Sequence, residues 1–192
     1  GAALMTETEG EEAYLCGAYN MVPNNVLADL ALAAMRELGP IEFTQEEDAY
    51  AARIAEGYPA GTREIGLSHM GAPLSLLARP LNGEVHEPFD VGKVMPGSTD
   101  VGDVSWITPT TMISAATWAL GIPGHSWGIT ATGAMSIGHK GMLYAAKTMA
   151  LVGYELPTNP DTLERAKAEF REATAGQPYQ TPLPEGLQPT LP

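Results

Sequence analysis

The sequence predicts an α/β fold, because segments with helical periodicity alternate with segments that have the composition of strands. Helical spacing is clear after the Pro-Asn-Asn step at 23–25 and returns in the carboxyl-terminal third. Between them, residues 110–120 (TTMISAATWAL) carry no charge and are rich in β-branched and small side chains, which is typical of a strand buried on both faces. At 192 residues the chain is long enough for one domain with a sizeable core.

The amino-terminal part predicts a strand followed by a helix. Residues 6–16 (TETEGEEAYLC) suit an edge strand, and a turn follows them. A helix begins at Pro23, where Asn24 or Asn25 can cap it. It stops at the Gly-Pro step 39–40. Its apolar face consists of Val26, Leu27, Leu30, Leu32, Ala34, Met35 and Leu38.

The middle of the chain predicts a second helix and then loops. Thr44 and Glu47 have the spacing of a capping box, which predicts a helix from Thr44 to about Gly57. Glycine and proline interrupt residues 58–96 repeatedly, so loops with short strands are expected there, as an insertion or lid. A second short strand is expected at 125–132, after the charge-free run.

Two helices and a tail are expected in the carboxyl-terminal third. The first spans Ser136 to Gly153, and the second is capped by Thr158 or Asp161. The predicted face of the first helix consists of His139, Met142, Leu143, Ala146 and Ala150. The packed side of the second consists of Leu163, Ala166, Ala168 and Phe170. Residues 177–192 carry five prolines and are expected to be extended on the surface or disordered.

The composition excludes several classes of function. The formal net charge is −13, from 23 acidic and 10 basic residues, so the surface repels nucleic acid and anionic membranes. No apolar run approaches the roughly 18–20 residues of a membrane helix, and no secretory signal is visible at the amino end. Cys16 is the one cysteine, which rules out an intrachain disulfide and agrees with a reducing, cytoplasmic compartment.

Residues 97–141 hold the candidate site. This stretch is apolar and rich in turns, and its only acidic and imidazole groups are Asp100, Asp103, His125 and His139. Lysine and glutamate are nearly absent from it, unlike an ordinary solvated surface. We therefore expect it to form the wall of a pocket.

The two aspartates allow two interpretations. In a turn with Gly97 and Gly102, two carboxylates are suited to bind a cation or to orient a neighbouring imidazole. Alternatively, residues 98–100 cap a short helix that runs through Trp106, with Asp103 in its first turn.

The two histidines also allow two interpretations each. His125 follows a Gly-Ile-Pro-Gly bend, which suits metal binding or proton transfer, whereas packing beside Trp127 is the alternative. His139 lies with Lys140 at a helix amino end, where the helix dipole opposes cations. A neutral imidazole there can donate a hydrogen bond to a substrate oxygen. The alternative for His139 is an inward-facing core position.

Several of these motifs together resemble a known family. GAALMTET, the helix after PNN, GSTDVGDVSW, the HSW step and SIGHKGM are similar, in this order, to the aminobenzoyl-glutamate hydrolase B-subunit group. That group is among the two-metal amidohydrolases and peptidases that include aminoacylase and carboxypeptidase G. The resemblance covers nearly the whole chain and is densest over 97–150.

The resemblance implies a domain organisation. Residues 1–18 would be the end of an α+β lid or dimerisation domain, including its last strand. Residues 19–176 would be the carboxyl-terminal half of a mixed-sheet catalytic domain with a dinuclear metal centre, and residues 177–192 the proline-rich tail.

The resemblance also implies roles for the candidate residues. His125 stands at the family's carboxyl-terminal metal-ligand histidine, and Asp100 and Asp103 occupy its active-site acidic segment. His139 would contact substrate or support the pocket. The family's other metal ligands lie in an amino-terminal half that this chain lacks, so the chain alone is expected to be inactive and to bind no metal.

Two functions are therefore expected. The first is a portion of a metal-dependent amidohydrolase that cleaves the amide bond of an N-acyl amino acid of the aminobenzoyl-glutamate type. The intact enzyme would hold two divalent ions, manganese or zinc, to activate water. It would be a cytoplasmic homodimer that includes the amino-terminal half or a companion chain. The alternative is a non-catalytic α/β binding or assembly module that retains the fold.

Overall fold

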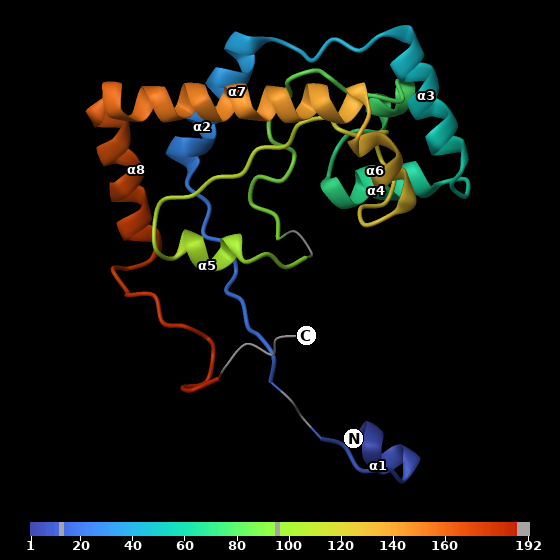
Figure 1. Cartoon of the computed structure of the whole chain (residues 1–192). Coiled ribbons are helices and arrows are strands. Elements are labelled where there is room, and N and C mark those ends of the chain that lie inside the picture. The colour runs from blue at the N-terminus through green and yellow to red at the C-terminus, as the bar shows by residue number, and fades with distance from the viewer. Residues whose placement is uncertain (12–13, 95–96, 188–192) are drawn as a thin grey trace.

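The computed structural model describes residues 1–11, 14–94 and 97–187, and these residues are mainly helical (Figure 1). The helices in chain order are α1 (Ala2–Thr6), α2 (Asn25–Leu38), α3 (Gln45–Glu56), α4 (Thr62–Met70), the 3-10 helix η1 (Leu74–Ala78), α5 (Val101–Ser105), α6 (Trp127–Gly133), α7 (Ser136–Thr158) and α8 (Pro160–Ala173). None of these helices is long and apolar enough to span a membrane.

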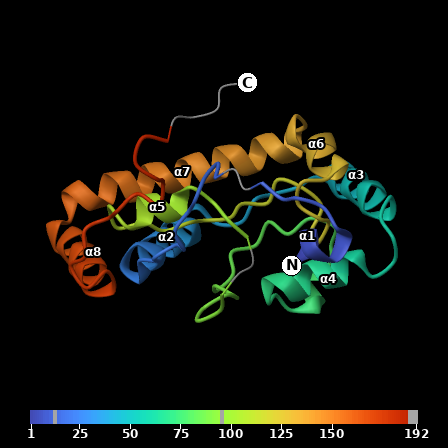
Figure 2. The ribbon, with the colours of Figure 1, turned by 90° about the horizontal axis from the view of Figure 1, so that it is seen from below.

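The helix α7 organises the fold. It contacts α2 and α8 toward one end and α6 toward the other, and α6 in turn contacts α3. Figure 2 shows α7 running along the length of the molecule, with α8 and α2 at one end and α3 and α6 at the other. The main buried cluster lies at the α3–α6 end and consists of Ala51, Ile54, Leu81, Ala119, Ile122 and Ile137.

The predicted α/β class is wrong, and no mixed sheet forms in the described residues. Residues 110–120 are irregular and form no strand, and their one bridge is a parallel contact between Pro23 and Thr110. The predicted edge strand at 6–16 is absent from its described part, and 125–132 is largely α6 instead of a strand. A strand needs a ladder of hydrogen bonds to a neighbour. No other described segment supplies that ladder.

The predicted loop region at 58–96 also differs from expectation, except for its last two residues, which lie outside the described ranges. It contains α4 and η1 rather than short strands. Leu67 of α4 and Leu81 are fully buried, which anchors this region to the core. Frequent glycine and proline therefore mark the ends of short helices here, not strands.

The Pro-Asn-Asn step begins α2 as predicted and also attaches α8. Asn24 is 2% exposed, and its Oδ1 accepts from the Leu27 amide at 3.0 Å. Its Nδ2 donates to the Ala166 carbonyl of α8 at 2.9 Å. Glu169 of α8 accepts from the amides of Asn25 and Val26, both at 3.0 Å. Burial acts to raise the pKa of Glu169, but these hydrogen bonds lower it.

The predicted capping box of α3 is confirmed. The Thr44 hydroxyl accepts from the Glu47 amide at 3.2 Å, and the Glu47 carboxylate accepts from the Thr44 amide at 2.7 Å. Glu47 is 8% exposed and also pairs with Lys140 of α7 at 2.6 Å. Its other oxygen accepts from the Ser136 hydroxyl at 2.6 Å. The carboxylate thus compensates the unfavourable placement of Lys140 at a helix amino end.

The helix α7 forms where predicted, but the predicted inner face is wrong. The five residues of that face, His139, Met142, Leu143, Ala146 and Ala150, are all exposed. The buried residues are Ile137, Gly138, Gly141, Tyr144 and Thr148. A Cβ on Gly141 would lie 2.4 Å from the Ala116 carbonyl, and one on Gly138 would lie 2.3 Å from that of Gly133. The two glycines therefore let the backbone of α7 lie close to the Ala116 and Gly133 carbonyls, on the side of the helix opposite to the predicted face.

The last helix, α8, is confirmed with a shifted start. It begins at Pro160 after Asn159, not after Thr158 or Asp161. Ala166 is fully buried and Phe170 is half-buried, whereas Ala168, predicted to pack inward, is exposed. Residues 177–187 of the predicted tail are irregular, and residues 188–192 lie outside the described ranges.

Candidate functional site

His125 lies in a bend between the irregular residues 110–120 and α6. Its φ is 54°, in the left-handed region that residues other than glycine seldom adopt. Such a backbone costs on the order of 1–3 kcal/mol and persists only where neighbouring contacts hold it. The side chain is exposed. The bend therefore presents an imidazole to the outside at a local cost in backbone energy.

Tyr58 supplies the contacts that hold this bend. Its hydroxyl lies 2.7 Å from the Ser126 hydroxyl and accepts from the Gly128 amide at 2.9 Å. Its ring stacks on Trp127, with centroids 5.2 Å apart and an interplanar angle of 6°. The backbone that follows His125 is thus fixed to the end of α3 through one tyrosine. The sequence pattern identified residues 57–59 only as a helix stop and did not reveal this role.

The GSTDVGDVSW motif binds residues 19–22. The Asp103 carboxylate accepts from the Tyr19 amide at 3.3 Å, and the Ser105 hydroxyl accepts from the Val22 amide at 2.8 Å. The Trp106 indole donates to the Asn20 carbonyl at 2.9 Å. The short helix that the second interpretation of this motif predicts is observed, as α5.

Asp100 and Asp103 have different surroundings. Asp100 precedes α5 and is exposed, and its side chain makes no capping hydrogen bond. The capping oxygen is instead the Thr99 hydroxyl, 3.3 Å from the Val101 amide. Asp103 is partly buried and bonded on both oxygens, to the Tyr19 amide and to the Tyr179 hydroxyl.

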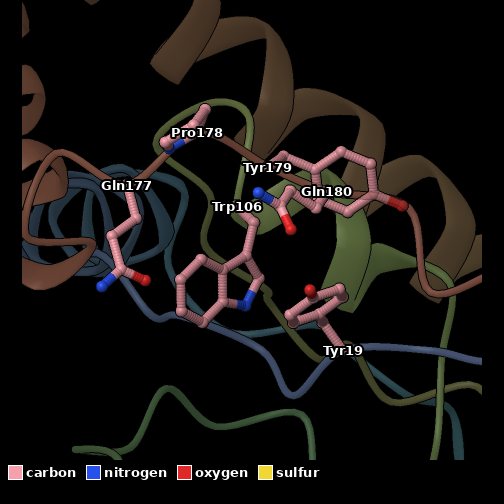
Figure 3. Close-up of a pocket in the computed structure, with 6 residues that line it drawn as sticks. All are labelled: Tyr19, Trp106, Gln177, Pro178, Tyr179 and Gln180. Carbon is pink, nitrogen blue, oxygen red and sulfur yellow. The ribbon is translucent and has the colours of Figure 1, made fainter.

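A pocket of about 210 Å³ is lined by Tyr19, Trp106 and Tyr179 (Figure 3), and two of these residues bond to Asp103. The Tyr19 ring lies 5.3 Å from that of Trp106 and 5.6 Å from that of Tyr179, centroid to centroid. The remaining lining residues are Gln177, Pro178 and Gln180 of the tail. Tyr179 donates to Asp103 at 2.8 Å, and this hydrogen bond to a carboxylate raises the pKa of Tyr179. The start of the tail is therefore packed against α5.

His139 lies in the first turn of α7 and is exposed, so its alternative as an inward-facing core residue is wrong. Its amide continues the helix by donating to the Met135 carbonyl at 3.0 Å. The imidazole therefore stands on the surface at the end of α7 that contacts α6.

The four candidate residues are not assembled into one cluster. α5 lies apart from α6 and from the beginning of α7 in both views (Figures 1 and 2). Within residues 1–11, 14–94 and 97–187, no hydrogen bond or ion pair joins any two of Asp100, Asp103, His125 and His139. The same ranges contain no group of three or more potential ligands placed to hold a metal ion.

Comparison with known proteins identifies a longer relative. The chain is 34% identical, over 199 aligned positions, to the B subunit of p-aminobenzoyl-glutamate hydrolase from Escherichia coli (strain K12). The match covers 99% of this chain but 41% of the relative, so the chain spans about two fifths of that protein's length. The resemblance predicted from the motifs is thereby confirmed. No protein-family model matches the chain, and no solved structure does.

Proposed function

We propose, from this similarity, that the chain is part of a hydrolase that cleaves the amide bond of an N-acyl amino acid of the aminobenzoyl-glutamate type. The observation that carries the proposal is the 34% identity to one subunit of a hydrolase over nearly the entire chain. Because the chain spans about two fifths of that relative, the remainder of the active enzyme comes from outside the chain. This remainder is either another part of one polypeptide or a companion chain.

Metal dependence is part of the proposal, with two manganese or zinc ions in the complete enzyme. The described residues do not by themselves fit such a centre, because they bring no three potential ligands together. The exposed imidazole of His125, on a backbone held by Tyr58, is the best-placed single ligand. The remaining ligands would come from the rest of the enzyme.

The other candidate residues take supporting roles in this proposal. Asp103 positions residues 19–22 and the tail tyrosine Tyr179 through its two oxygens. Asp100 and His139 are exposed, so each is open to contact with the substrate or with the rest of the enzyme. The complete enzyme is proposed to be a cytoplasmic homodimer.

The test is an activity assay on a reconstituted enzyme. This chain is co-produced with the portion of the E. coli relative that has no counterpart here, and hydrolysis of p-aminobenzoyl-glutamate is measured. Activity should disappear in chelator and return with manganese or zinc. His125→Ala should abolish it, whereas the control His69→Ala, at an exposed histidine of α4, should not. Full activity in His125→Ala would overturn the ligand assignment.

A non-catalytic binding or assembly module is the second candidate function. The observation that favours it is the exposed apolar side of α7, where Met142, Leu143 and Met149 are each more than half exposed. The mass of the native assembly separates the two candidates. A stable partner that carries the missing metal ligands supports the hydrolase, and a solitary chain supports the module.

A further inference from the structure

The outward side of α7 is apolar along most of its length. We call it the outer α7 face, and it consists of His139, Met142, Leu143, Ala146, Lys147, Met149, Ala150, Gly153 and Tyr154, all exposed. The large apolar members are well exposed, at 59% for Met142, 55% for Leu143, 61% for Met149 and 69% for Tyr154. At 100° per residue these positions form one continuous side of the helix.

Two other helices of the chain show what its solvent-facing sides look like. The exposed residues of α2 include Asp29, Arg36 and Glu37. Those of α8 include Asp161, Glu164, Arg165, Arg171 and Glu172. In contrast, residues 136–154 contain no aspartate or glutamate, although the net charge of the chain is −13. The outer α7 face is therefore not built as a solvated surface.

The shape and chemistry of the face suit a close protein partner. Its small residues Ala146, Ala150 and Gly153 let another backbone approach, and a Cβ added to Gly153 would meet no atom within 4 Å. Methionines such as Met142 and Met149 adapt their shape to a partner surface. Along one edge the face borders a pocket of about 240 Å³, lined by Leu38, Pro40, Ile41, Glu42, Lys140, Leu143, Tyr144 and Lys147.

The charges of the face argue against a second copy of the same face. An antiparallel two-fold pairing centred on this face would bring Lys147 near its own counterpart, with no acid on the face to pair with it. A partner with apolar side chains and an acidic residue opposite Lys147 fits better.

We propose that the outer α7 face is the surface on which the rest of the complete enzyme packs. More than half of the length of the E. coli relative has no counterpart in this chain, so a large partner surface exists in such a protein. This inference rests on the proposed function for the existence of that remainder. It concerns assembly, however, and its test does not depend on hydrolysis.

The test compares one substitution in two places. Ala146→Glu puts a charge in the middle of the outer α7 face, and Ala49→Glu puts the same charge on the exposed side of α3. Each variant is co-produced with a tagged remainder of the E. coli relative, and the amount of chain retained on the tag is measured. Ala146→Glu should lower retention at least tenfold, and Ala49→Glu should leave it unchanged. Met149→Glu is a second variant with the same expected loss.

A measurement on the isolated chain shows whether the variants fold. Because position 146 is exposed there, Ala146→Glu should leave its thermal midpoint within about 2 °C of the parent. Equal retention of the Ala146→Glu and Ala49→Glu variants would overturn the inference, and so would failure of the parent chain to be retained. An isolated chain that is dimeric until Ala146→Glu is introduced would instead identify a second copy as the occupant. Retention that depends on position 146 without hydrolysis would leave the inference standing and reject the proposed function.

Discussion

Glu47 and Lys140 form an ion pair of 2.6 Å that joins the first turn of α3 to the amino-terminal part of α7. The Lys140 ammonium also donates to the Glu42 carbonyl at 2.8 Å and lies over the Phe43 ring. The Glu47 carboxylate is thus surrounded by donors from two helices. Glu47 therefore both caps α3 and makes a tertiary contact with α7.

Replacing this carboxylate should destabilise the chain. Glu47→Gln removes the ion pair and weakens two other hydrogen bonds, from Thr44 and Ser136, in a largely buried place, although Lys140 remains partly solvated. The expected loss is about 1–3 kcal/mol of unfolding free energy. Urea denaturation followed by circular dichroism measures it. Glu46→Gln, at the exposed neighbouring position, is the control and should change stability by less than about 0.5 kcal/mol.

The same carboxylate predicts a dependence of stability on pH. Burial alone would raise the pKa of Glu47, but hydrogen bonds from Lys140, Ser136 and Thr44 lower it from 4.5 to about 2. A carboxylate whose pKa is lower in the folded state stabilises the fold above its unfolded pKa. That contribution should be lost as the pH falls from about 4.5 to about 2. Denaturation at several pH values should show a shallower loss in Glu47→Gln than in the parent, and parallel curves would contradict the assignment.

A methyl group at Gly102 should separate α5 from residues 19–22. A Cβ there would lie 2.1 Å from the Tyr19 carbonyl, so the crossing segment would have to move. Gly102→Ala should therefore cost more than about 2 kcal/mol and alter the fluorescence of Trp106, whose indole contacts Asn20. Gly133→Ala is the matched control, because a Cβ there meets nothing within 4 Å. Equal effects of the two substitutions would show that residues 19–22 do not pack on Gly102.

Removing one hydroxyl should loosen the His125 bend. Tyr58→Phe keeps the stacking on Trp127 but deletes the contacts with Ser126 and Gly128. Amide hydrogen exchange over residues 121–128 should accelerate in this variant. In the reconstituted enzyme, affinity for the activating metal should fall about 10-fold to 100-fold. Tyr14→Phe, which removes an exposed hydroxyl bonded to the Pro182 carbonyl, should change neither measurement.

Local signals in the sequence predicted α2, α3, α7 and α8, whereas α4, η1 and α6 lie in segments that were predicted as loops or strands. The capping groups of Asn24 and Thr44, the Gly-Pro stop at 39–40 and the periodicity after Ser136 all correspond to observed helix boundaries. These signals depend on contacts within about four residues, so they can be recognised without the rest of the fold.

The candidate site was predictable only as separate residues. The motifs identified His125 and Asp103, but the support of His125 comes from Tyr58, 67 positions earlier in the chain. The hydrogen bonds of Asp103 with Tyr19 and Tyr179 likewise join residues that are far apart in the sequence. Neither set of contacts has a local sequence signal.

Sequence patterns therefore determined the ends of α2 and α3, the start of α7, the acidic composition and the similarity to one subunit of a hydrolase. Tertiary structure decided that residues 110–120 form no strand, because a strand requires a partner from elsewhere in the chain. It also decided which side of α7 is buried. Apolar periodicity favoured the side with Met142 and Leu143, but close backbone contact at Gly138 and Gly141 turned the opposite side inward.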